Sequence, residues 1–104
     1  MFHFTDKDRY DAVRASVNWL FKAGQPPAGH PFGAYFTNLP EGTMNLAKRL
    51  GVPKRKTEFV FGFTGGEELV PLRGDRGRFI FYSLVDYLVV KARQVPGYPA
   101  QRVI

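Results

Sequence analysis

The segment Thr57-Glu58-Phe59-Val60-Phe61-Gly62-Phe63-Thr64 carries a phenylalanine at every second position from 59 to 63, and two glycines follow it directly. Side chains of a β-strand alternate between the two faces of a sheet, so this spacing places the three rings on one face. Paired glycines favour a tight turn. We therefore expect a strand over Thr57–Thr64 that turns back to pair with a second strand over Leu69–Leu72.

The N-terminal part of the chain predicts a strand, a helix and another strand. Phe2–Thr5 alternates aromatic and polar residues, as a short strand does. Across Asp6–Ala23, apolar residues recur at helical spacing: Tyr10, Val13, Val17, Leu20 and Phe21. This pattern predicts one long helix that Gly24 ends. After the proline- and glycine-rich loop Gln25–Gly33, we expect a strand over Ala34–Thr37.

The C-terminal half adds a short helix and two more strands. Thr43–Leu50 fits a helix with Thr43 as its N-cap and with Met44 and Ala47 facing inward, and Gly51 would end it. A loop is expected over Pro53–Lys56.

The apolar run Arg78–Val90 is compatible with a buried helix or with two strands joined near Ser83 and Leu84. Its β-branched and aromatic content favours strands. The sequence from Pro96 to Pro99 resists regular structure. The sequence thus predicts an α+β fold with one domain over residues 1–95 and an irregular tail over residues 96–104.

Composition fits one self-sufficient domain. The 104 residues are 44% hydrophobic and 15% aromatic, and none is cysteine, which excludes disulfides, cysteine-bound zinc and thiol nucleophiles. We expect no metal site. No stretch approaches the roughly 18 apolar residues of a membrane span, and the first residues lack the order of a signal peptide. The chain as given is therefore expected to be soluble and to have no membrane partner. Its compartment stays open: it is cytoplasmic for the chain as given, but the absence of cysteine does not distinguish a cytosolic protein from an exported one.

A formal net charge of +6 favours anionic partners, whether nucleic acid or small molecules that carry phosphate. Much of the excess lies within residues 48–56, which we call the basic segment: Lys48, Arg49, Lys54, Arg55 and Lys56. A second group comprises Arg73, Arg76 and Arg78. Charge alone does not distinguish a binding surface from a solvated basic rim.

Three short motifs occur in a fixed order: His3-Phe4-Thr5-Asp6, then Gly33-Ala34-Tyr35-Phe36-Thr37-Asn38-Leu39-Pro40, then Phe81-Tyr82-Ser83-Leu84-Val85-Asp86-Tyr87. In this order the chain resembles the ADP-ribosyltransferases with a His-Tyr-acid triad, the branch that contains diphtheria toxin and poly(ADP-ribose) polymerases. It is most similar to the small bacterial toxin domains of the HYD type. The resemblance covers nearly the whole chain.

The resemblance implies split antiparallel β-sheets with a cleft that binds NAD+ as the substrate. His3, Tyr35 and Asp86 would be the catalytic residues. His3 would bond a ribose hydroxyl, and the backbone of Phe4 would bind the nicotinamide carboxamide. The residues implied to contact NAD+ are His3, Phe4, Thr5, Gly33, Tyr35 and Phe36.

The chemistry of these residue types agrees with the resemblance. Loss of nicotinamide leaves oxocarbenium-like charge on the ribose, which a carboxylate such as that of Asp86 can stabilise. The ring of Tyr35 can stack on the cationic pyridinium, an interaction of about 0.5–2 kcal/mol. An aspartate stands where polymerase-type enzymes have glutamate, which argues against chain-elongating activity.

The implied activity is transfer of ADP-ribose from NAD+ to a macromolecular acceptor, either protein or nucleic acid. Resemblance to toxin domains further implies an effector role, delivery into a target cell and a cognate immunity or antitoxin protein. Three alternatives stay open: an NAD+ glycohydrolase with water as acceptor, an inactive relative, and a nucleic-acid-binding module without catalysis. In the last of these, the basic residues hold phosphates while aromatics such as Phe59, Phe61 or Tyr82 stack on bases.

Overall fold

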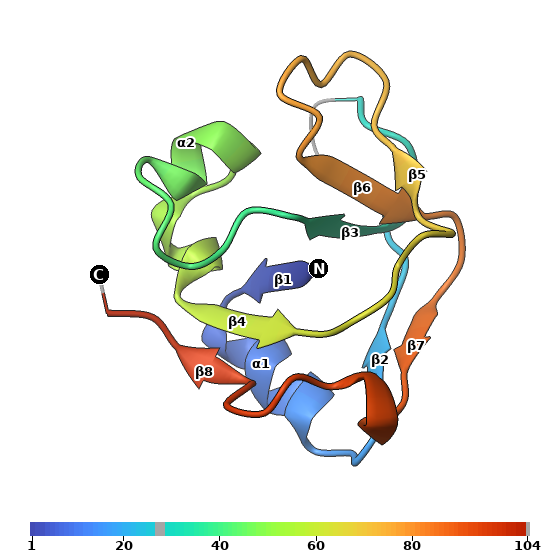
Figure 1. The fold of residues 1–104 in the computed structure, drawn as a ribbon. Helices are drawn as coiled ribbons and strands as arrows, with labels where there is room; N and C mark the ends of the chain where they lie inside the picture. Colours follow the sequence, from blue (N-terminus) through green and yellow to red (C-terminus); the bar gives the residue numbers. More distant parts are fainter. Residues whose placement is uncertain (27–28, 104) are drawn as a thin grey trace.

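The phenylalanine-rich segment forms β4 (Phe59–Gly62), an interior strand of a six-stranded sheet. The structure, a computed structural model, describes residues 1–26 and 29–103. Within these residues an α+β fold combines two α-helices with two sheets whose strand pairs are all antiparallel (Figure 1). The larger sheet has the order β5-β6-β3-β1-β4-β8, and the smaller sheet pairs β2 with β7.

The other strands are β1 (Phe2–Thr5), β2 (Trp19–Phe21), β3 (Ala34–Thr37), β5 (Val70–Pro71), β6 (Ile80–Ser83), β7 (Tyr87–Val89) and β8 (Ala100–Gln101). The helices are α1 (Lys7–Arg14) and α2 (Leu46–Leu50), with two 3-10 helices, η1 (Lys54–Thr57) and η2 (Lys91–Arg93). The predicted strands Phe2–Thr5 and Ala34–Thr37 are confirmed, and so is the division of Arg78–Val90 into two strands.

Aromatic residues from both sheets form the core. Phe61 and Phe63 are 0% and 1% exposed, and the small sheet covers them with Trp19 and Phe21 of β2 and Val89 of β7. The ring of Phe61 lies edge-on to those of Trp19 and Phe21, with centroids 4.9 and 5.4 Å apart. These contacts pack the small sheet against β4, and the rings of Phe21 and His3, with centroids 4.6 Å apart, place β2 opposite β1.

The long helix predicted over Asp6–Ala23 is wrong beyond Arg14, where α1 ends. The residues after it form β2, in which Trp19 and Phe21 are buried while Leu20 between them is 41% exposed. That alternation has the period of a strand, and pairing with β7 outweighs the local helical pattern. Val17, expected on the inner face of a helix, is 72% exposed.

Strand pairing differs from the prediction in the second half of the chain. The strand expected over Leu69–Leu72 is β5, and it pairs with β6 instead of β4. Both edges of β4 are already occupied, by β1 on one side and β8 on the other. The short helix is also displaced: α2 begins at Leu46 rather than after Thr43, buries Leu46, and leaves Met44 78% exposed. Gly51 ends it as expected, with φ of 70°.

The segment expected as an irregular tail contains β8, which pairs with β4 through Gln101 opposite Phe59 and Ala100 opposite Val60. The Tyr98 hydroxyl donates to the carboxylate of Glu41, and Arg102 donates to the carbonyl oxygen of Thr57 at 2.9 Å. The segment is therefore integrated with the sheet up to residue 102. Residue 104 of the predicted tail, and residues 27–28 of the predicted loop Gln25–Gly33, lie outside the described residues.

Candidate functional site

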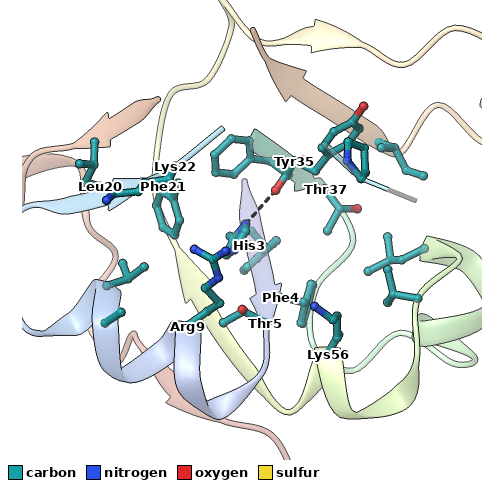
Figure 2. A pocket seen from close by; sticks show the side chains of 18 of the residues that line it. His3, Phe4, Thr5, Arg9, Leu20, Phe21, Lys22, Tyr35, Thr37 and Lys56 are labelled. Carbon is teal, nitrogen blue, oxygen red and sulfur yellow. Dashed lines mark hydrogen bonds between the residues drawn. The ribbon is translucent and has the colours of Figure 1, made fainter. Parts of the chain in front are cut away.

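A cavity of about 610 Å³ lies beside β1, where β1 and β3 separate. The two strands are in register at one pair only, Phe2 with Thr37, whereas β1 pairs with β4 along its whole length. Beyond that pair the sheet is split, and α1, β2 and the α2–η1 segment supply the remaining walls (Figure 2). The volume lies within the range of pockets that bind small molecules and cofactors.

Most of the residues that the sequence predicts for the site line this cavity: His3, Phe4, Thr5, Tyr35 and Phe36. Gly33 and Asp86 are absent from the lining. The structure therefore brings together two members of the predicted triad, His3 on β1 and Tyr35 on β3, and places the third nearby but outside the cavity wall.

The imidazole of His3 is held in one orientation by a hydrogen bond from its Nδ1 to the carbonyl oxygen of Tyr35, 2.8 Å away (Figure 2). Because a carbonyl oxygen can only accept, Nδ1 carries the proton. Burial lowers the pKa of His3 from 6.5 to about 4, against the opposing effect of this hydrogen bond, and the charge of Arg9 lowers it further. The ring is therefore neutral at pH 7, and Nε2 is a hydrogen-bond acceptor.

Tyr35 contributes both its backbone and its ring. One face of the ring stacks on Tyr82 of the neighbouring strand β6, with centroids 5.4 Å apart and planes inclined by 17°. The hydroxyl donates to the carbonyl oxygen of Pro31 at 2.5 Å, and burial raises the pKa of the phenol. A flat ligand can consequently stack only on the face that Tyr82 leaves uncovered.

Asp86 lies directly before β7 and is exposed. Its Oδ1 accepts the N–H of Ala23 at 2.8 Å, which fixes the β6–β7 connection to the chain that leaves β2. Lys22, the neighbour of Ala23, lines the cavity. Asp86 was expected within an apolar strand, and the structure places it at the end of the connection between β6 and β7 instead.

Gly33 has a role in packing that the sequence interpretation missed. It exchanges two backbone hydrogen bonds with Gly24, at 3.0 and 2.9 Å. A Cβ at this position would lie 2.6 Å from the carbonyl oxygen of Ser83. The close approach of β3 and β6 therefore requires glycine here, independently of any ligand.

Three basic residues that the sequence interpretation treated as surface charge, or did not single out, line the cavity: Arg9, Lys22 and Lys56. A signal for one of them was present, because Arg9 precedes Val13 by four residues and shares its helical face. Val13 was expected to face inward, and both residues line the cavity. No aspartate or glutamate of the described residues belongs to the lining, so the cavity is positively charged.

Comparisons of this chain with protein-family models, with curated proteins and with solved structures found no match. Function is therefore inferred from the chemistry of the cavity. Within residues 1–26 and 29–103, no group of three histidine, cysteine, aspartate or glutamate side chains is placed to hold a metal ion. None of the helices in this described part is long and apolar enough to cross a membrane.

Proposed function

We propose that this chain is an ADP-ribosyltransferase-type domain that binds NAD+ in the cavity beside β1 and cleaves its nicotinamide–ribose bond. The observation that carries the proposal is the hydrogen bond between His3 Nδ1 and the carbonyl oxygen of Tyr35. It joins the first two residues of the predicted triad at the cavity, and it leaves Nε2 of a neutral imidazole to accept a ribose hydroxyl.

Nicotinamide binding would use the split between β1 and β3. Phe4 of β1 is not paired with a residue of β3, so its backbone is available to hydrogen-bond the carboxamide. The pyridinium would stack on the uncovered face of Tyr35, an attraction of about 0.5–2 kcal/mol that weakens when the neutral ring departs. Loss of this attraction as nicotinamide becomes neutral therefore costs the reaction at most about 2 kcal/mol.

Asp86 is the proposed source of negative charge for the ribose cation that develops as nicotinamide leaves. One of its carboxylate oxygens is held by the N–H of Ala23. Because Asp86 lies outside the cavity lining, this role requires that bound NAD+ extends from the cavity toward the chain segment that follows β2. In this account Asp86 acts in the transition state more than in ground-state binding.

A second candidate is the nucleic-acid-binding module, which the basic segment favours because its five lysines and arginines are exposed. The prediction that exposed aromatic rings stack on bases is wrong for Phe59 and Phe61, which are only 6% and 0% exposed. Tyr82 is already stacked on Tyr35. Without these three rings, phosphate contacts would carry most of the binding, and such contacts give binding without sequence selection.

The proposal is tested by nicotinamide release from NAD+, with and without cell lysate as a source of acceptor. Asp86→Asn keeps an oxygen that can accept from Ala23 but removes the charge, and Asp8→Asn on the exposed face of α1 is the matched control. We expect Asp86→Asn to lower the rate about a hundredfold or more, as loss of one charge-stabilising group does, with the NAD+ dissociation constant changed only a few-fold.

Unchanged release in Asp86→Asn would remove Asp86 from the reaction. No release from the wild-type chain, with lysate present, contradicts the proposal as a whole. Release without transfer of ADP-ribose to any macromolecule identifies water as the acceptor, and the activity is then that of a glycohydrolase.

A further inference from the structure

The positive charge of the cavity comes from three separate parts of the fold. Arg9 belongs to α1, Lys22 directly follows β2, and Lys56 belongs to η1. These residues are 13 or more positions apart in the sequence, so their convergence on one cavity follows from the tertiary structure and not from a local run of charge. Figure 2 shows the guanidinium of Arg9 pointing toward His3, with Lys56 on the other side of β1.

Nearby acids do not balance this charge. Among the described residues, Arg9 and Lys22 form no ion pair. The Nζ atom of Lys56 lies 3.7 Å from Oδ2 of Asp6, but a guanidinium nitrogen of Arg55 lies 3.5 Å from the same oxygen. Asp6 also caps α1 by accepting the N–H of Arg9 at 3.0 Å. One carboxylate thus faces two cations of η1, and Arg9 remains available to a ligand.

We propose that Arg9 and Lys56 form an anion subsite that binds the diphosphate of a dinucleotide, with Lys22 adding positive charge at the same cavity. The inference rests on the proposed function for the identity of the dinucleotide. A guanidinium presents a planar fork of N–H donors that matches phosphate oxygens, and a lysine ammonium supplies a compact charge. A diphosphate held there would share the cavity with His3, whose Nε2 is the proposed acceptor for the hydroxyl of an attached ribose.

The test is calorimetric titration at low ionic strength with three probes: ADP-ribose, adenosine and inorganic pyrophosphate. ADP-ribose keeps the diphosphate but has no nicotinamide bond to cleave, adenosine lacks phosphate, and pyrophosphate lacks the nucleoside. Arg9→Gln and Lys56→Gln each remove one charge from the cavity. Their matched controls are Arg49→Gln and Lys48→Gln, which remove the same charge from exposed positions of α2 that do not line it.

We expect ADP-ribose to bind the wild-type chain at least about tenfold more tightly than adenosine, since charge-assisted hydrogen bonds add to its affinity. Arg9→Gln and Lys56→Gln should each weaken ADP-ribose about tenfold or more, while the α2 controls change it less than about twofold. Adenosine affinity should be the same in all variants. Pyrophosphate that binds as tightly as ADP-ribose would overturn the nucleotide part of the proposal.

Two further outcomes separate this subsite from the proposed reaction. If ADP-ribose does not bind, or if the cavity variants and the α2 controls weaken it equally, the subsite is refuted even where nicotinamide is released. If ADP-ribose binding depends on Arg9 and Lys56 but the wild-type chain never releases nicotinamide, the subsite stands and the transferase activity fails.

Discussion

The neutral state of His3 makes the stability of the fold depend on pH. The pKa of His3 is about 4 in the folded chain, chiefly because the ring is buried, and 6.5 is its ordinary value. Between these values the unfolded chain binds a proton that the folded chain does not, so the free energy of unfolding rises with pH there. The difference between the two pKa values corresponds to about 3 kcal/mol, lost progressively as pH falls from 6.5 to 4.

Urea denaturation at a series of pH values from 7 down to 4 measures this effect. The variant His3→Gln has no imidazole, so its free energy of unfolding should fall less steeply than that of the wild type, by about 1.4 kcal/mol for each pH unit in the window. His30→Gln, which removes the exposed histidine, is the control and should keep the wild-type slope. Parallel curves for the wild type and His3→Gln would refute the neutral, buried imidazole on which the site depends.

Substitutions at two other positions, Tyr35 and Gly33, test the cavity and the strand pairing beside it. Tyr35→Ala should weaken NAD+ binding, measured by calorimetry, by up to about 2 kcal/mol. It should lower the free energy of unfolding by less than the ~3–5 kcal/mol of a deleted core aromatic. Tyr35→Phe should bind NAD+ within a few-fold of the wild type, and an unfolded Tyr35→Ala would assign the ring to the core. Gly33→Ala should lower the free energy of unfolding by about 1–3 kcal/mol, because its Cβ would meet the Ser83 oxygen at 2.6 Å. Gly42→Ala, with no atom within 4 Å of its Cβ, is the control, and equal urea midpoints would contradict this assignment.

The sequence predicted best the strands in which alternation is local and complete. The phenylalanines at positions 59, 61 and 63 alternate without interruption, and β4 forms within the predicted segment, although it covers only Phe59–Gly62 because Thr57 belongs to η1. By contrast, β2 has only three residues, too few to establish a period, and Leu20 and Phe21 also fit helical spacing. Its identity is decided by pairing with β7, some 70 residues away in the chain, which no local pattern contains.

The pairing partners of the short strands could not be predicted from local patterns either. Val70 and Pro71 pair with β6, and Ala100 and Gln101 pair with β4, over two residues each. At the site, His3 and Tyr35 were predicted because their motifs are local. The convergence of Arg9, Lys22 and Lys56 was missed, since it depends on how α1, β2 and η1 are placed around the split between β1 and β3.

The most direct test of the central claim is the rate of nicotinamide release from NAD+ by the wild-type chain and by His3→Leu, measured by chromatography in the presence of lysate. The account predicts release by the wild type and a rate at least about a hundredfold lower in a folded His3→Leu, because leucine has no hydrogen-bond acceptor to replace Nε2. Equal rates in the two proteins, or no release by the wild type, would contradict it.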